Sequence, residues 1–219
     1  MKRSYEEEIM DDFSIRDERV DIALSELKVI NKYLGGISTT RSGLKYFINS
    51  SGKKIRVLDI GAGSSDNLIS LKKDFPKLYI LSIDKNLRAL TSSKNSLQKI
   101  NSDAFILPFK DDSCDLIHVS LFLHHFTEIQ INVLLKEFLR ISTRGIIIND
   151  LQRSYLALIG IKILTKLFSK SEMVKHDAPL SVKRGFKKLE LIRLFYQDKT
   201  LNIKVKRKWA FRWMIVIKK

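Results

Sequence analysis

The sequence predicts a three-layer α/β fold built on a doubly wound, mostly parallel sheet. From residue 55 onward, short apolar runs typical of strands alternate with stretches that have helical spacing. These runs are continuously apolar, as expected for strands in a parallel sheet that is covered on both faces. Two last strand-like runs, 201–209 and 211–219, have almost nothing between them, and so short a link makes a hairpin. We therefore predict seven strands with an antiparallel C-terminal hairpin.

The elements follow in a regular order along the chain. Apolar residues recur at helical spacing in residues 15–48, with a break at "LGG", so residues 1–50 are predicted to be an N-terminal helical extension. The main domain is predicted to span residues 51–219, with an insertion at about 151–190. Its remaining elements are predicted as strands at 55–60, 78–84, 103–107, 115–121 and 145–150, helices at 66–75, 86–97, 127–141, 154–169 and 187–196, and a polar loop at 169–185.

The composition is that of a soluble globular chain and not of a disordered one. Of the 219 residues, 44% are apolar and 29% are charged. A single cysteine, Cys114, excludes a disulfide within the chain and a cysteine-rich zinc site, and it favours a reducing, cytoplasmic location. The charged N-terminus does not resemble a signal peptide. The longest apolar stretch, 154–169, contains Lys162 and Lys166 and is too short for a membrane span.

Positive charge is concentrated in the last third of the chain. The net charge is +16, but residues 1–150 carry 22 basic and 20 acidic residues, whereas residues 151–219 carry 18 and 4. Such asymmetry fits a nucleic acid, an anionic membrane surface or an acidic partner. A lysine-rich, solvated face is the alternative, and composition alone does not separate these readings.

A glycine-containing loop follows the first predicted strand. Gly61 and Gly63 lie at the turn before the next helix, where a sheet of this kind places its ligand, and Asp84 ends the following strand. This pattern fits either a dinucleotide or a nucleoside cofactor. The dinucleotide fingerprint has a third glycine where this chain has Asp66, whose charge would face a pyrophosphate. Asp59 suits a cationic group such as an amine. Both details favour a nucleoside cofactor.

The stretches "VLDIGAGSS", "SIDKN" and "SDAFILPFKDDSCDLIHVSLFLHHF" resemble, in order and spacing, the motifs of class I S-adenosylmethionine-dependent methyltransferases. The branch that they resemble methylates ubiquinone, menaquinone and other small molecules. The resemblance covers residues 54–150 and implies a Rossmann-like fold, a methyltransferase domain over residues 51–219 and S-adenosyl-L-methionine as the cofactor. One residue departs from the family, which often has glycine where this chain has Ser65; a serine there can cap the next helix.

The resemblance also implies roles for individual residues. Asp59, Gly61 and Gly63 would line the methionine part of the cofactor, Asp84 would bind the ribose hydroxyls, and Asp103 would bind the adenine amino group. The same resemblance adds Ala62, Lys85, Ala104, Ser120 and Leu121 to the cofactor site. Taken singly, an aspartate at a strand end is usually a turn or cap residue, but acids at successive strand ends beside a glycine turn favour a site.

A histidine pair follows the fourth predicted strand. Family members that methylate hydroxyls resemble this chain in having such a pair together with an aspartate after the fifth strand, so His124 is the predicted base, Asp150 its partner and His125 a supporting residue. Packing or capping of the next helix is the alternative role of both histidines. His118, inside the fourth strand, is expected to be a core residue. His176 and Asp177 are predicted contacts of the acceptor substrate, and no metal site is predicted.

The predicted acceptor is a small hydrophobic or aromatic molecule of phenolic, quinone or polyketide type, with O-methylation favoured over C-methylation. The helix at 154–169 is apolar almost all round, so it is either buried or in contact with an apolar molecule. A contact with a membrane surface or an acidic carrier protein is a further expectation. The alternative function is RNA modification or RNA binding by the basic last third, although "VSLFLHH" lacks the proline-containing motif of enzymes that methylate exocyclic amines. The oligomeric state is not predicted.

Overall fold

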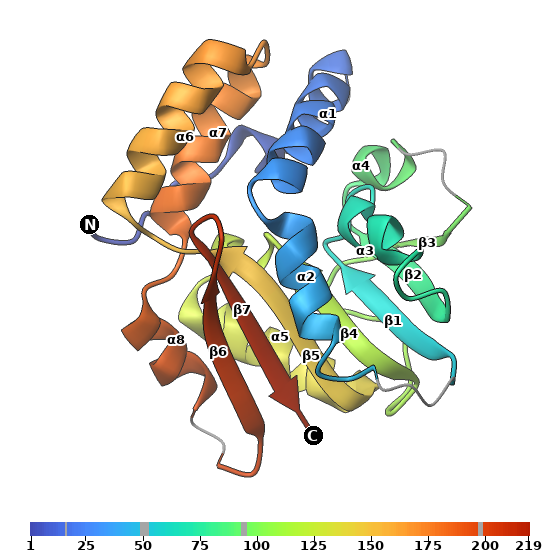
Figure 1. Ribbon diagram of the computed structural model, residues 1–219. Helices are drawn as coiled ribbons and strands as arrows, with labels where there is room; N and C mark the ends of the chain where they lie inside the picture. Colours follow the sequence, from blue (N-terminus) through green and yellow to red (C-terminus); the bar gives the residue numbers. More distant parts are fainter. Residues whose placement is uncertain (16, 49–52, 93–95, 197–198) are drawn as a thin grey trace.

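The computed structural model describes residues 1–15, 17–48, 53–92, 96–196 and 199–219. Its centre is a seven-stranded sheet in the order β3-β2-β1-β4-β5-β7-β6 (Figure 1). Strands β1 to β5 pair in parallel, whereas β7 pairs antiparallel with both β5 and β6. This confirms the predicted fold class. The strands are β1 (Ile55–Ile60), β2 (Leu78–Asp84), β3 (Gln98–Asn101), β4 (Cys114–Ser120), β5 (Ser142–Leu151), β6 (Asn202–Lys208) and β7 (Arg212–Lys218).

Both faces of the sheet are covered by helices. Neighbouring strand residues such as Val57 and Leu58, or Ile147 and Ile148, belong to different core clusters, because successive side chains point to opposite faces. This explains why the strands have continuous apolar sequences. One face packs against α2 (Gly36–Leu44) and α3 (Asp66–Leu71), and the other against α5 (Glu128–Ile141) and α8 (Lys188–Phe195).

A third apolar cluster lies beyond the ends of the parallel strands. It contains residues from α1 (Glu18–Tyr33), α6 (Tyr155–Phe168) and α7 (Glu172–Arg184), and Leu151 at the end of β5 packs against it. Helices α6 and α7 lie side by side, next to α1 (Figure 1). The chain before α1, including the short helix η1 (Ile9–Asp11), contacts α7. These elements together cover the edge of the sheet at which its ligands are expected.

The strand predicted at residues 103–107 is wrong, because the third strand is β3 at Gln98–Asn101. Strand β3 pairs only with β2, at the edge of the sheet, so its sequence "QKIN" does not need the continuous apolar pattern of a central strand. Residues 103–107 instead form a turn in which Asp103 Oδ1 accepts a hydrogen bond from the Phe105 N–H at 3.0 Å. An aspartate commonly organises such a turn.

The polar loop predicted at residues 169–185 is also wrong, because residues Glu172–Arg184 form helix α7. Val174, Ala178 and Val182, spaced four residues apart, are buried in the third cluster. Pro179 inside the helix and many polar residues conceal this pattern in the sequence. Packing of one helical face outweighs these local preferences.

Two predicted helices are shorter in the structure. The helix predicted at 66–75 ends at Leu71, where α3 ends, and the one predicted at 86–97 is α4 (Leu87–Thr91). Residues 93–95 of the latter and the domain boundary predicted between residues 50 and 51 lie outside the described residues. Helix α2, from the predicted extension, packs on β5 and β7, with Leu44 fully buried.

Candidate functional site

The loop after β1 exposes its backbone to a cavity. Gly61 and Gly63 have φ values of +62° and +48°, a region that disfavours residues with a side chain. A Cβ atom at Gly61 would lie 2.1 Å from the Phe122 ring, so this glycine is needed for close packing. A Cβ atom at Gly63 would meet nothing within 4 Å. The backbone at Gly63 is therefore open to a ligand in the cavity.

Ser65 keeps the backbone conformation that a glycine would have at this position. Its φ is +55°, and its buried side-chain oxygen lies 2.6 Å from Ser82 Oγ. The predicted capping role is wrong, because Ser65 precedes α3 without making a side-chain cap hydrogen bond. Asp66, in the third-glycine position, forms an ion pair with Lys28 Nζ at 2.8 Å.

Two carboxylates are oriented at the ends of β2 and β3. Asp84 accepts hydrogen bonds from the Gly63 N–H at 2.7 Å and the Asn86 N–H at 2.8 Å. Burial raises the pKa of Asp84 despite these two donors. For Asp103, burial acts in the same direction, but the Phe105 N–H and Lys85 Nζ, which is 2.9 Å away, lower the pKa overall. Both carboxylates keep free lone pairs for hydroxyl or amino donors.

Asp59 ends a buried chain of hydrogen bonds. His118 Nδ1 lies 2.6 Å from Asp59 Oδ1, and His118 Nε2 lies 3.0 Å from Thr40 Oγ1. Asn149 Nδ2 donates to Thr40 Oγ1 at 3.1 Å, and the Arg212 guanidinium donates to Asn149 Oδ1 at 3.2 Å. Because Thr40 Oγ1 accepts from Asn149, its own hydrogen can point to His118 Nε2. Every donor in this chain then points toward the Asp59 carboxylate, and His118 is the core residue that the sequence predicts.

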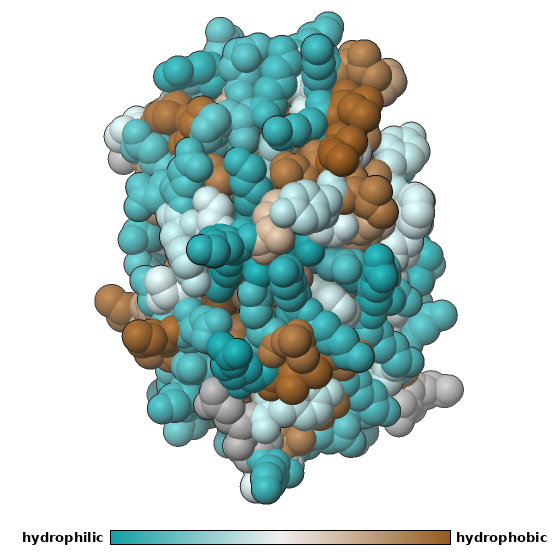
Figure 2. Space-filling model, turned by 90° about the vertical axis from the view of Figure 1, so that its left-hand side faces the viewer, coloured by the Kyte–Doolittle hydropathy of each residue, from teal (hydrophilic) through white to brown (hydrophobic). Residues whose placement is uncertain are grey.

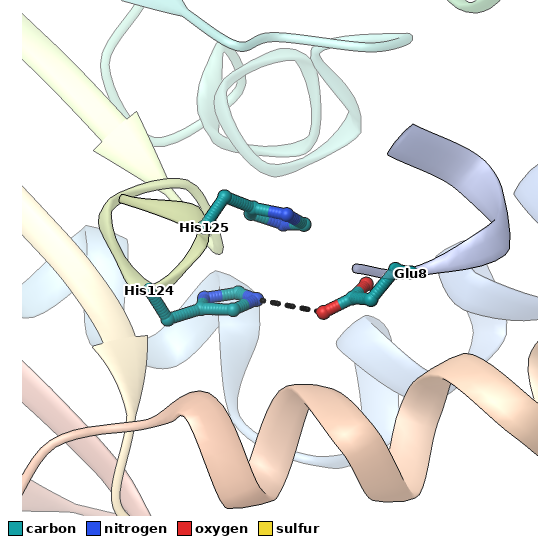
Figure 3. Close-up of side chains that lie close together, drawn as sticks. All are labelled: Glu8, His124 and His125. Carbon is teal, nitrogen blue, oxygen red and sulfur yellow. Dashed lines mark ion pairs between the residues drawn. The ribbon is translucent and has the colours of Figure 1, made fainter. Parts of the chain in front are cut away.

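His124 and Asp150 form a second buried pair. His124 Nδ1 lies 2.7 Å from Asp150 Oδ1, and both side chains are almost completely buried. His124 Nε2 has no hydrogen-bond partner and points toward Glu8, whose Oε1 is 3.6 Å away (Figure 3). Burial alone would lower the pKa of His124, but Asp150 and Glu8 outweigh it and raise the pKa to about 9. At neutral pH the ring is therefore protonated and faces a carboxylate on each side; once Nε2 has lost its proton, an imidazole oriented by Asp150 through Nδ1 can accept a proton there.

The N-terminal segment covers His124 and His125. The sequence analysis did not predict this contact. His125 Nδ1 lies 2.9 Å from Asp11 Oδ1, and Arg184 pairs with Asp11 at 3.0 Å while donating to the His125 carbonyl at 2.8 Å. Arg3 donates to the Phe126 carbonyl at 3.0 Å. The acidic run "EEEIMDD" in an otherwise basic chain was the available signal, because it needs basic partners within the fold.

One cavity of about 650 Å³ joins most of the predicted site residues. Asp150 lies behind His124 and not in the lining, and His176 lies in a separate groove beside Lys162 and Lys166. Asp177 lines the cavity but is already occupied, because it accepts hydrogen bonds from two N–H groups of η1. The predicted residues that line the cavity are Asp59, Gly61, Ala62, Gly63, Asp84, Lys85, Asp103, Ala104, Ser120, Leu121, His124, His125 and Asp177.

Glu8, His124 and His125 also have the composition of a metal-binding group. One potential ligand atom from each lies within 4.8 Å of the others (Figure 3). However, Arg184 approaches Glu8 to 4.0 Å and pairs with Asp11, which places a fixed positive charge beside this group. Asp150 and Glu8 stabilise protonated His124, and Asp11 pairs with His125, so an ion-pair network accounts for the cluster without a metal.

Comparisons with known proteins agree with this geometry. Residues 58–149 match the family model for a methyltransferase domain, whereas no curated protein sequence matches the chain. A crystal structure of the plantazolicin methyltransferase BpumL with a pentazolic desmethylPZN analog and SAH has a TM-score of 0.70, with 18% identity over 94% of this chain and 93% of that chain. A SAM-dependent methyltransferase from Aquifex aeolicus has a TM-score of 0.60, with 15% identity over 89% and 97% of the two chains.

A third solved structure is magnesium protoporphyrin IX methyltransferase (ChlM) from Synechocystis PCC 6803 with bound SAH. It has a TM-score of 0.59, with 14% identity over 87% of this chain and 86% of that chain. Residues 58–149 thus match a methyltransferase domain, and this match together with the fold supports an S-adenosylmethionine-dependent methyltransferase. The methyltransferase resemblance seen in the sequence agrees with these findings, and the SAH bound in two of these structures is consistent with S-adenosylmethionine as the cofactor.

The residues around the cavity fit this cofactor. The open position at Gly63 leaves room beside the backbone, Asp59 offers a carboxylate to an amino group, and Asp84 offers lone pairs to two ribose hydroxyls. The matched domain, residues 58–149, contains all three and ends one residue before Asp150. The N-terminal segment and α7, which cover the other half of the cavity, lie outside the match.

Proposed function

We propose that this enzyme methylates a hydroxyl group on a small hydrophobic or aromatic acceptor, with His124 as the general base. The observation that carries this proposal is the unpartnered Nε2 of His124, which lies buried in the cavity that Asp59, Gly63 and Asp84 also line. Its nearest partner, Glu8 Oε1, forms an ion pair with it at 3.6 Å but no hydrogen bond, so this nitrogen can receive a group that arrives with the substrate.

The side chains around His124 define how a proton would move. S-adenosylmethionine supplies a methyl group on a sulfonium, which is intrinsically reactive toward a nucleophile. His124 Nε2 would take the proton of the acceptor hydroxyl as its oxygen gains the methyl group and the S–CH3 bond of the sulfonium breaks, and Asp150 would orient the ring and stabilise the imidazolium. Glu8 faces the same nitrogen, so it must move away when an acceptor binds. Its departure removes one of the charges that raise the pKa of His124, so a larger fraction of the ring is unprotonated at neutral pH and able to accept a proton.

One wall on the acceptor side of the cavity is apolar. Phe105, Phe122 and Phe126 form two edge-to-face ring contacts beside the histidine pair, and Val174 and Ala178 of α7 complete this wall. Such a surface favours an aromatic or lipid-like acceptor of phenolic, quinone or polyketide type. BpumL, which has been crystallised with a desmethylPZN analog, is an example of this fold with a small-molecule acceptor.

The test combines calorimetry with an acceptor screen. The wild-type protein should bind S-adenosylmethionine and transfer methyl groups to phenols from such a screen. His124→Gln should bind the cofactor with an affinity within about threefold of wild type but lose turnover by about 10²–10⁴-fold. His125→Gln is the matched control, since its neighbouring ring should affect turnover much less. Full activity of His124→Gln would exclude the proposed base.

Two further experiments distinguish this function from a metal-dependent one and from RNA methylation. Activity should persist in a chelator; a loss that added Zn²⁺ restores would instead identify Glu8, His124 and His125 as metal ligands. RNA should accept no methyl groups. If RNA is methylated and small acceptors are not, the basic last third serves RNA modification and the proposed acceptor class is wrong.

A further inference from the structure

We propose that helix α6 is a docking surface for an anionic lipid bilayer. One side of α6, formed by Ala157, Ile161 and Thr165, is buried against α1 and α7. The other side exposes large apolar side chains, each with between 55% and 78% of its surface accessible. These residues, which we call the α6 ridge, are Tyr155, Leu156, Ile159, Ile163, Leu167 and Phe168.

The ridge is concentrated on one face of the molecule. Figure 2 shows hydrophobic residues gathered near the top of this face, where α6 and α7 lie in Figure 1. Single exposed apolar residues are normal on a protein, but a contiguous group marks an interaction site. Among the described residues, no helix is both long and apolar enough to cross a membrane. The ridge is therefore suited to lie in the surface of a bilayer and not to span it.

Lysines flank the ridge without acidic partners. Lys162, Lys166 and Lys170 are exposed, and no ion pair to them occurs within the described ranges. The first two also line a groove of about 440 Å³ with Lys175 and Lys183, in which Glu6 is the only acidic residue of the lining. Helix α6 itself contains no aspartate or glutamate. Lys175 pairs with Glu172 at 2.7 Å, whereas the charges of Lys162, Lys166 and Lys170 are left to complement phosphate groups.

A bilayer satisfies both features at once. Lysine side chains keep their charge at the level of lipid phosphates while their aliphatic stems continue the apolar surface. A nucleic acid would use the lysines but leave the ridge in water. A second copy of this chain would cover the ridge but would bring two sets of unpaired lysines together. An acidic carrier protein would match the charge of the lysine-lined groove but would leave the apolar side chains of the α6 ridge in water.

Helices α6 and α7 connect the ridge to the cavity. Helix α6 packs on α7, and Val174, Ala178 and Ser181 of α7 line the cavity from within. A bilayer in contact with the ridge would thus lie one helix layer from the acceptor site. Membrane docking is nevertheless a separate proposal, because it makes no use of His124 or the cofactor.

Vesicle sedimentation with the full-length protein tests this proposal. The protein should bind vesicles of phosphatidylcholine with about one third phosphatidylglycerol, and bind pure phosphatidylcholine vesicles at least about tenfold more weakly, with a loss of binding in high salt. Ile159→Ser/Leu167→Ser should lower the affinity by about tenfold or more, because these side chains no longer enter the bilayer. Lys162→Glu/Lys166→Glu should lower it by about 10–100-fold.

Two control variants test whether the membrane contact lies on α6. Ile129→Ser/Val133→Ser removes two exposed apolar residues from α5, and Lys72→Glu/Lys73→Glu reverses two exposed lysines after α3. Both should bind vesicles like wild type. All variants should keep wild-type melting temperatures and transfer methyl groups to a water-soluble acceptor, so failure here is distinct from failure of the proposed function.

Three results would overturn the proposal. One is equal vesicle binding by the α6 variants and wild type. Another is the absence of vesicle binding together with binding to an acidic protein or RNA. The third is a dimer, measured by sedimentation velocity, that Ile159→Ser/Leu167→Ser dissociates while vesicles remain unbound.

Discussion

This protein contains two buried histidine–aspartate pairs, one between β1 and β4 and the other between the turn after β4 and β5, and they differ in the surroundings of the second imidazole nitrogen. In the first pair, His118 contacts Asp59 and Thr40, so both of its nitrogens are satisfied. In the second pair, His124 contacts Asp150, and its other nitrogen faces the cavity without a hydrogen-bond partner. The comparison shows that the pair itself does not identify a base. The partner of the second nitrogen distinguishes a structural histidine from a candidate catalytic one.

The largest expected effect comes from breaking the second pair. Asp150→Asn leaves a similar shape but removes the charge that stabilises protonated His124, so turnover should fall by about 10²–10⁴-fold. The affinity for S-adenosylmethionine, measured by calorimetry, should change by less than about threefold. A large loss of cofactor affinity with normal turnover would reverse the roles assigned to the two pairs.

Breaking the first pair should instead weaken cofactor binding more than it lowers turnover. Asp59→Asn removes a carboxylate proposed to bind the cofactor amino group, which should weaken S-adenosylmethionine binding by about 10–100-fold. Turnover at saturating cofactor should fall much less. Calorimetry together with initial rates over a range of cofactor concentrations checks this separation, and an unchanged Kd would contradict it.

The pH dependence of activity should report the protonation of His124. Because the pKa of His124 is raised to about 9, kcat/KM should rise with pH up to about that value, since a base must be unprotonated. Glu8→Gln removes one of the charges that raise this pKa and should shift the rising limb to lower pH. Asp11→Asn is the neighbouring control and should shift it less. A profile that is unchanged in Glu8→Gln would mean that Glu8 does not act on His124.

The free energy of unfolding should also depend on the protonation of His124. His124 has a folded-state pKa of about 9 and a usual value of 6.5. Its protonation therefore contributes stability fully below pH 6.5, and this contribution is lost as the pH rises toward 9. The free energy of unfolding, followed by urea titration, should decrease over this range in wild type. His124→Gln should lack that decrease; an identical pH dependence in both proteins would rule out a raised pKa.

The part of the site that the sequence could predict lies at the ends of strands. Asp59, Asp84 and Asp150 each stand at the end of an apolar run. Parallel strands have their carboxyl ends at one edge of the sheet, so the fold class alone predicts that these three carboxylates lie near one another. The strand at 103–107 was mistaken because an edge strand need not be apolar. Helix α7 was missed because its pattern is visible only when its packing partners are known.

The acidic N-terminal residues were missed for a different reason. Glu8 and Asp11 lie more than a hundred positions from His124 and His125 in the sequence, and no periodicity or strand order connects them. Arg184 and Asp177 of α7 hold this segment, and α7 itself was taken for a loop. Long-range ion pairs of single residues depend on the complete fold, whereas a strand-end motif depends only on local order.

The smallest expected effect tests whether the hydrogen-bond chain behind Asp59 acts as a unit. Thr40→Val keeps the shape of the side chain but leaves His118 Nε2 and Asn149 Nδ2 without their shared partner. The free energy of unfolding should fall by about 1 kcal/mol, and S-adenosylmethionine binding should weaken by about threefold, because Asp59 is held less firmly. Thr40→Ser retains the hydroxyl and should restore both values. If Thr40→Val lowers stability while cofactor affinity stays at the wild-type value, the chain supports the fold only, and the orientation of Asp59 depends on His118 alone.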